Sequence, residues 1–174
     1  MLAGLRPDTQ VWFWGEGRSP SLPRFRDLYG LSGEVVAAVD LVRGIGRLAG
    51  LDVIDVPGAT GDLDTDYGAK ARAAISALAD HDLVWVHVEA PDEASHMGDL
   101  REKVRAIERV DAEVLAPVLE ALPRPYVLVL PDHYTPLATR THSGDPVPFV
   151  VGASLPGAGG GGAMAFGESD AAAT

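Results

Sequence analysis

Five acidic and imidazole side chains occur at two points of the sequence, and together they could bind metal ions. Asp92 and His96 stand four residues apart, so one helical turn would bring both to the same face. Asp132 and His133 are adjacent, and His142 follows shortly after them. Mixed carboxylate and imidazole ligands suit Mn²⁺, Zn²⁺ or Fe²⁺ better than Ca²⁺ or Mg²⁺. Five such ligands exceed what one tetrahedral site needs, so they predict two neighbouring ions that would clamp a phosphoryl group and activate a nucleophile.

Each Asp–His pair taken alone has a plainer interpretation, as the cap of a helix or turn. The segments that precede the two pairs favour the metal site. Residues 84–88 alternate valine with other residues, and residues 126–130 form a second apolar run; both read as strands. Two strands that each end near an Asp and a His predict that these side chains meet at the carboxyl edge of an open sheet.

Five further charged or imidazole residues need an interpretation, and two of them are candidate substrate contacts. Arg140 is predicted to hold a substrate phosphate through a bidentate contact, with stabilisation of its own loop as the alternative. Arg43, near a strand-to-helix turn, is a weaker candidate of the same kind. His87 lies inside a strand, and we interpret it as packed or hydrogen-bonded rather than as a ligand. His81 and Lys70 are interpreted as solvated surface residues.

The alternation of strands and helices predicts an α/β protein, a three-layer α/β/α sandwich around a mostly parallel sheet. Strands are predicted at 10–14, 33–38, 51–56, 84–88, 126–130 and 147–151, and helices at 21–29, 40–48, 64–79 and 99–122. Asp111 interrupts the apolar stripe of the last helix. Its carboxylate either accepts a hydrogen bond from a nearby donor or is the partner of a metal-bound histidine. Residues 1–155 are predicted to form part of one domain, and the Gly/Ala-rich residues 156–174 a mobile tail.

Composition restricts the partners and the setting of the protein. The 174 residues carry a net charge of -11, which argues against nucleic acid as a partner. A small phosphorylated substrate would therefore need metal ions or a local arginine cluster to bind. The absence of cysteine excludes disulfides and thiolate metal sites and fits a cytoplasmic protein. No apolar run reaches membrane-spanning length, so no membrane contact is expected.

Several of these motifs together resemble the archaeal-type, cofactor-independent phosphoglycerate mutases of the alkaline phosphatase superfamily. The pattern combines Asp-x-x-x-His, Asp-His-x-Thr-Pro and His-x-x-Asp-Pro-x-Pro-Phe, and this combination is specific. The similarity extends over nearly the whole chain, through residues 12–17, 56–61, 87–93, 132–136 and 142–149.

This resemblance implies a reaction and a division of the ligands. The family interconverts 3-phosphoglycerate and 2-phosphoglycerate, a glycolytic isomerisation, through a phosphoserine intermediate and with two divalent ions, Mn²⁺ or Zn²⁺. By resemblance, Asp92, His96 and His142 ligate one ion, and Asp132 and His133 ligate the other.

The chain departs from the family pattern in ways that bear on activity. By resemblance, family members are longer, and their preceding half supplies a further Asp ligand, the nucleophilic Ser and an inserted domain that binds substrate. Ser19 and Ser21 lack the context of that nucleophile. We therefore expect the carboxyl-terminal half of a mutase, inactive alone, with one metal site complete and self-association through the face that the missing half would cover. The alternatives are a related phosphotransferase or phosphatase, such as the homoserine kinase-like relatives, and a non-catalytic metal-binding remnant.

Overall fold

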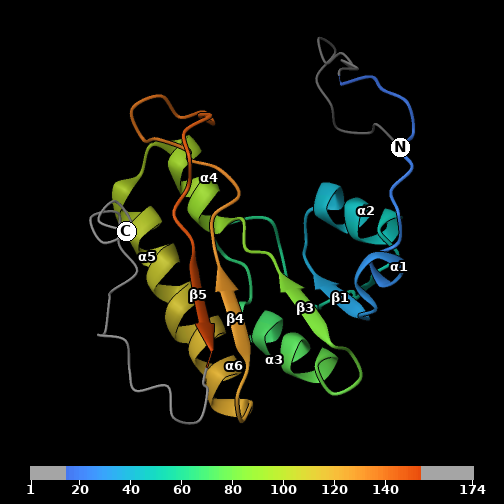
Figure 1. The fold of residues 1–174 in the computed structure, drawn as a ribbon. Helices are drawn as coiled ribbons and strands as arrows, with labels where there is room; N and C mark the ends of the chain where they lie inside the picture. The colour runs from blue at the N-terminus through green and yellow to red at the C-terminus, as the bar shows by residue number, and fades with distance from the viewer. Residues whose placement is uncertain (1–14, 154–174) are drawn as a thin grey trace, which may run out of the picture.

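Two small β-sheets and the helices around them make up residues 15–153, the part of the chain that the computed structural model describes (Figure 1). The first sheet is parallel, in the order β2-β1-β3, with Glu34 of β1 opposite Asp52 and Val84. The second is an antiparallel pair, β4 with β5. The strands are β1 (Gly33–Val36), β2 (Asp52–Val53), β3 (Leu83–Val86), β4 (Tyr126–Val129) and β5 (Val150–Ala153).

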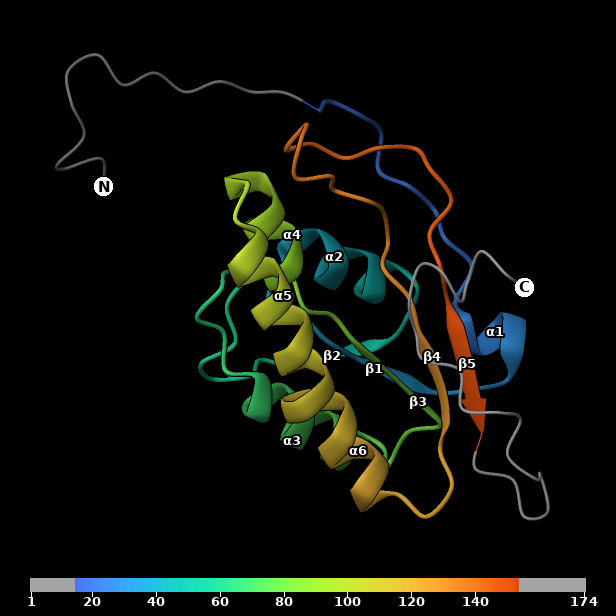
Figure 2. The same ribbon diagram turned by 90° about the vertical axis from the view of Figure 1, so that its left-hand side faces the viewer.

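Helices cover both faces of the parallel sheet. In Figure 2, α2 lies on one side of β1 and β3, and α3 lies on the other side together with the long helical run α5–α6. This layering confirms the predicted α/β class. The helical elements are α1 (Phe25–Tyr29), α2 (Asp40–Leu48), α3 (Tyr67–Ala77), α4 (Ala90–Met97), α5 (Leu100–Arg109), η1 (Val110–Leu115) and α6 (Ala116–Ala121).

Each face of the sheet has its own apolar core. On the α2 side, Val35 and Ala37 of the sheet segment pack with Val42 and Leu51. Gly46 of α2 permits this close approach, because a Cβ there would lie 2.7 Å from a Val35 methyl carbon. On the other side the core is formed by residues from α3, α4, α5 and η1: Tyr67, Ala71, Ala90, Ala106 and Val114. The α4 helix is thereby fixed to the same core as α3.

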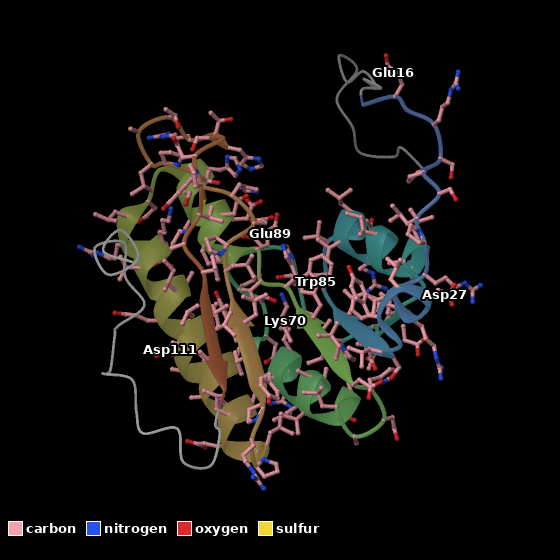
Figure 3. All side chains as sticks on the ribbon, viewed as in Figure 1. Glu16, Asp27, Lys70, Trp85, Glu89 and Asp111 are labelled. Carbon is pink, nitrogen blue, oxygen red and sulfur yellow. The ribbon has the colours of Figure 1, made fainter. Side chains whose placement is uncertain are left out.

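The predicted single helix over 99–122 is instead three consecutive elements. The π-helical turn η1 separates α5 from α6, and Pro117 stands in the first turn of α6. Proline has no N–H for the usual bond to the carbonyl four residues earlier, so a widened turn before it accommodates the missing donor. Asp111 lies in this turn, and its side chain is exposed on the outer helix (Figure 3).

The mostly parallel sheet that the sequence predicts corresponds to the ladder of β2, β1 and β3, which is parallel throughout. Within residues 15–153, β4 pairs only with β5 and no ladder joins it to β3. The last strand lies at 150–153 rather than 147–151. The predicted strand at 10–14 and tail at 156–174 fall outside the described residues. No helix in the described part of the chain has the length and apolar character to cross a membrane.

The prediction that His81 is solvated is wrong. Its Nε2 lies 3.0 Å from an Asp52 carboxylate oxygen, its Nδ1 lies 3.1 Å from the Ala77 carbonyl oxygen, and the ring is mostly covered. The hydrogen bond to Asp52 raises the pKa of His81 above its ordinary value, and the Ala77 carbonyl and the nearby Glu34 carboxylate add to this rise against the opposing effect of burial. This cluster lies at the amino ends of the parallel strands, away from the predicted metal ligands.

Candidate metal centre

The short helix α4 carries Asp92 and His96 to the carboxyl edge of the parallel sheet. Three residues separate it from the end of β3, and Pro91 stands in its first turn, where a missing N–H costs nothing. Asp92 lies in the first turn and His96 in the last, the ends at which a helix favours an acidic and a basic group respectively. The helix stops at Gly98, whose φ of 75° is left-handed. The helical turn that the spacing of Asp92 and His96 required is therefore present.

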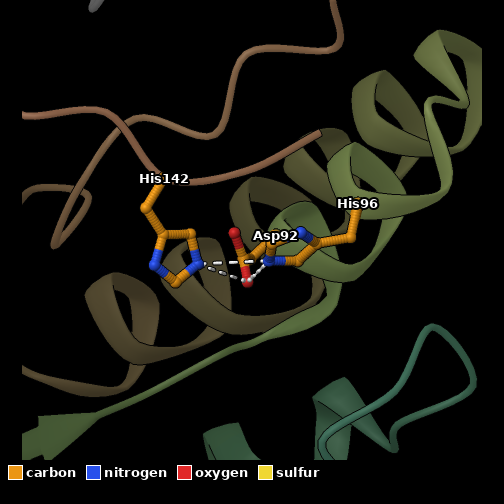
Figure 4. Close-up of side chains that lie close together, drawn as sticks. All are labelled: Asp92, His96 and His142. Carbon is orange, nitrogen blue, oxygen red and sulfur yellow. Dashed lines mark hydrogen bonds and ion pairs between the residues drawn. The ribbon is translucent and has the colours of Figure 1, made fainter. Parts of the chain in front are cut away.

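Asp92, His96 and His142 converge on one point (Figure 4). The His96 Nε2 lies 3.1 Å from an Asp92 carboxylate oxygen and 3.1 Å from the His142 Nε2. The same Asp92 oxygen is 3.6 Å from the His142 Nε2. The donor set consists of two ring nitrogens and a carboxylate oxygen that face one another. A cation shared among them would satisfy all three.

A backbone bridge brings His142 to this point from a loop. The Ser143 N–H donates to the Tyr134 carbonyl at 2.9 Å, an isolated antiparallel bridge that folds the segment back on itself. This fold stacks the His133 ring on the His142 ring, with centroids 3.7 Å apart. The segment after β4 thus meets α4, although these residues lie far apart in the sequence.

Thr135 connects the second Asp–His pair to the first, a role that sequence reasoning missed. Its buried hydroxyl donates to the Asp92 carboxylate and lies 3.2 Å from the His133 Nδ1. A His133 that donates from Nδ1 to this hydroxyl has Nε2 available as a ligand. Asp132 is more exposed, with a carboxylate oxygen 3.4 Å from the His133 Nε2. The threonine of the Asp-His-x-Thr motif was the signal that could have identified Thr135.

Acidic side chains make the surroundings of the centre favourable for cations. Glu89, Asp92 and Glu93 also have carboxylate oxygens within 4.8 Å of one another. Burial raises the pKa of Glu89, and the negative charges of Asp92 and Asp132 raise it further. The pKa of His96 is raised as well, first by a hydrogen bond to the Arg140 carbonyl.

A buried lysine lies beneath this centre, so the prediction that Lys70 is solvated is wrong. Lys70 is 1% exposed, and its Nζ donates to the His87 carbonyl at 3.1 Å and to the Thr60 carbonyl at 3.4 Å. Figure 3 shows Lys70 and Glu89 in the middle of the molecule. Burial lowers the pKa of Lys70, and the nearby Glu89 carboxylate opposes that shift. Lys70 therefore ties the end of β3 to the loop before α3.

His87 lies beside the centre but outside its ligand groups. Its Nε2 is 3.4 Å from a Glu89 carboxylate oxygen, and its buried Nδ1 has no hydrogen-bond partner among the described residues. Burial lowers the pKa of His87. These contacts are those of a packed histidine.

The guanidinium of Arg43 is engaged away from the Asp92 group. It donates to the carbonyls of Ala37 and Ile54, each at 3.1 Å, and pairs with the Asp55 carboxylate. Its side chain is 13% exposed. These contacts join the end of β1 to the segment after β2.

Arg140, by contrast, lies beside the ligand group. Its side chain is exposed and passes over Gly98, and its carbonyl oxygen lies 2.8 Å from the His96 Nδ1.

The chain is similar to known proteins in both sequence and fold. Residues 5–158 match the profile of the metalloenzyme superfamily. The chain is 54% identical over 155 residues to a protein of Methanothrix thermoacetophila named 2,3-bisphosphoglycerate-independent phosphoglycerate mutase, covering 87% of this chain and 40% of that protein. A Methanosarcina acetivorans protein of the same name is 53% identical, covering 85% of this chain and 38% of that protein.

The fold of the chain is similar to that of a solved structure. The PH0037 protein from Pyrococcus horikoshii superposes with a TM-score of 0.70 at 34% sequence identity, covering 77% of this chain and 36% of that one. The chain thus spans about 40% of the length of the curated relatives named above.

Proposed function

The chain belongs to the metalloenzyme superfamily, and we propose that it carries part of the metal centre of a cofactor-independent phosphoglycerate mutase. The reaction would interconvert 3-phosphoglycerate and 2-phosphoglycerate through a phosphoserine. The observation that carries this proposal is the convergence of Asp92, His96 and His142 in a chain 54% identical to a protein named as such a mutase.

The donor atoms suit two divalent transition ions. Asp92, His96 and His142 would hold one ion, and Asp132 and His133 would contribute to the other. Carboxylate and imidazole donors favour Mn²⁺ or Zn²⁺ over Mg²⁺. When bound, such ions supply charge stabilisation for the transferring phosphoryl group. Thr135 would hold the Asp92 carboxylate and orient His133, so that both pairs keep a fixed relation.

The serines nearest to the ligands in the sequence are engaged elsewhere, which supports a nucleophile supplied from outside this chain. Ser95 is fully buried, and its hydroxyl donates to the Pro91 carbonyl at 2.7 Å. The Ser143 hydroxyl donates to the Asp145 carboxylate at 2.8 Å. We therefore expect the isolated chain to lack mutase activity while it retains the first metal site.

A chimera tests the function directly. This chain would replace the matching 155 residues of the Methanothrix thermoacetophila relative, and an enolase-coupled assay with Mn²⁺ would follow conversion of 3-phosphoglycerate. We expect turnover by the chimera, its loss on Asp92→Asn, and none by the isolated chain. A folded, metal-loaded chimera without turnover would contradict the mutase proposal. Efficient turnover by the isolated chain would contradict the proposal that the nucleophile is supplied from outside.

The substrate contact is proposed for Arg140 rather than Arg43. The Arg140 side chain is exposed beside the centre, whereas the Arg43 guanidinium is occupied by two carbonyls and a carboxylate. In the chimera, Arg140→Lys should raise KM for 3-phosphoglycerate, because lysine cannot make a bidentate phosphate contact. Arg43→Lys should change stability more than KM.

We also propose that the exposed face of β4 and β5 mediates self-association of this chain. Tyr126, Leu128 and Val151 are 77%, 57% and 65% exposed there. An apolar surface of this kind marks an interface when it is contiguous. Light scattering after gel filtration should show a dimer or larger species, and Leu128→Glu should convert it to monomer. Ile107→Glu, at an exposed site on α5, is the matched control. A monomeric wild-type chain would refute this proposal.

A further inference from the structure

Arg140 has a backbone conformation that its side chain disfavours. Among residues 15–153 it is the one residue other than glycine with a positive φ, 53°. A Cβ in this left-handed region crowds the backbone, so the conformation persists only where surrounding contacts hold it. One such contact is the Arg140 N–H, which donates to the Pro136 carbonyl at 2.8 Å. Strained backbone of this kind is found at sites where it positions a group for function.

The left-handed turn directs the Arg140 carbonyl at a candidate metal ligand. The carbonyl oxygen lies 2.8 Å from the His96 Nδ1. A carbonyl can only accept, so this nitrogen must carry the proton. The other ring nitrogen, Nε2, faces Asp92 and His142 at 3.1 Å each. A neutral imidazole protonated at Nδ1 has its lone pair at Nε2, which is the form that binds a metal there.

The side chain of Arg140 takes no part in this contact. The guanidinium passes over Gly98, where an added Cβ would lie 2.5 Å from the Arg140 Nε. Gly98 is the residue that ends α4, two positions after His96. The main chain therefore acts on His96 while the side chain lies along the end of the same helix.

We propose that Arg140 is a positioning residue of the metal centre, and that its main-chain carbonyl holds His96 in the tautomer whose Nε2 is free to bind metal. This role rests on the proposed function only in taking His96 as a ligand. It is separate from the proposed contact between the Arg140 side chain and a substrate phosphate. Partners of metal-bound histidines of this type typically change metal affinity by about 10–100-fold when they are lost.

The tautomer can be measured without any metal. In the metal-free chain, nitrogen-15 NMR of the imidazole rings above the His96 pKa should show His96 protonated at Nδ1. An Nε2-protonated ring, or a mixture of both forms, would overturn the proposal. Because no metal or substrate is present, this result does not depend on whether the chain belongs to a mutase.

Two substitutions then separate the carbonyl from the side chain. Arg140→Gly removes the guanidinium but accepts the left-handed backbone, so the Mn²⁺ affinity measured by calorimetry should stay close to wild type. Arg140→Pro fixes φ near -65° and removes the N–H, so Mn²⁺ affinity should fall about 10–100-fold. Ala138→Gly, in the same exposed segment, controls for added flexibility.

Each outcome of this comparison decides the question. Equal losses in Arg140→Gly and Arg140→Pro would assign the effect to the guanidinium and overturn the proposal, as would wild-type affinity in Arg140→Pro. If Arg140→Pro fails to fold, the His96 tautomer is compared between the wild-type chain and Arg140→Gly. The Nδ1–H form in both chains supports the proposed role of the Arg140 carbonyl. Loss of the Nδ1–H form in Arg140→Gly refutes it.

Discussion

Replacing the buried Lys70 by methionine should destabilise the protein measurably. Methionine has a similar length and no charge, so it can occupy the same space without donating a hydrogen bond. Lys70 is 1% exposed and donates to the His87 carbonyl at 3.1 Å. Its second contact, to Thr60 at 3.4 Å, is longer than a good N–H···O bond and adds little.

The expected loss follows from these contacts. A hydrogen bond from a charged donor contributes about 1.5–3 kcal/mol, and its removal leaves the His87 carbonyl without this partner. The variant no longer buries an ammonium group, and this gain offsets part of the lost hydrogen-bond energy. Burial lowers the pKa of Lys70, which shows that it disfavours the charged form. We expect Lys70→Met to lower the free energy of unfolding by about 2 kcal/mol.

Urea denaturation provides the assay, with Arg72→Met as its control. Arg72 lies on the same helix, but its side chain is 72% exposed and its nearest carboxylate oxygen, on Asp66, is 3.7 Å away. Its replacement should change stability by no more than about 0.5 kcal/mol. A Lys70→Met chain as stable as wild type, or more stable, would refute the assigned role of the buried ammonium.

The pH dependence supplies a second check on the same substitution. Because the pKa of Lys70 is lowered by folding, the unfolded chain binds its proton more tightly. Wild-type stability relative to Lys70→Met should therefore rise with pH between the folded pKa and the unfolded value of about 10.4. A difference that falls over this alkaline range would contradict the assigned burial.

Three further predictions follow from contacts elsewhere in the structure. His142→Ala should weaken binding of the first Mn²⁺ more than Asp132→Ala does, and calorimetric titrations in the reverse order would count against the ligand assignment. Folding raises the pKa of His81, so its contribution to stability should be largest below about pH 6.5 and be lost as pH rises through the folded pKa. The measurement is urea denaturation of wild type and His81→Gln across this range of pH. A difference in the free energy of unfolding that does not change with pH would contradict the prediction. Gly46→Ala should cost about 1–3 kcal/mol, because the new Cβ would lie 2.7 Å from a core valine methyl. Gly44→Ala, with open space around it, should be neutral or stabilising, and equal thermal shifts for the two variants would contradict this account.

Local spacing predicted some parts of the site well. The four-residue interval between Asp92 and His96 required a helical turn, and α4 supplies it. The approach of His142 depends on a backbone bridge between Tyr134 and Ser143, and no periodic pattern encodes such a contact. The resemblance to known motifs, rather than spacing, placed His142 with Asp92.

Other features depend on packing that a sequence pattern does not contain. Lys70 and His81 looked like exposed charges, yet the neighbouring strands and loops bury Lys70 and mostly cover His81. The helix predicted over 99–122 had an apolar stripe interrupted only at Asp111, and the missing N–H of Pro117 was the one further sign of the π-helical turn. The positive φ of Arg140 is likewise a tertiary effect, because arginine has no intrinsic preference for that region.

Binding of one divalent ion by Asp92, His96 and His142 underlies the whole proposal. An anomalous-difference map from crystals of this chain grown with Mn²⁺ would show whether this binding occurs. We expect a peak within bonding distance of an Asp92 carboxylate oxygen and of the Nε2 atoms of His96 and His142. A map without that peak, or with one only at the carboxylates of Glu89 and Glu93, would contradict it.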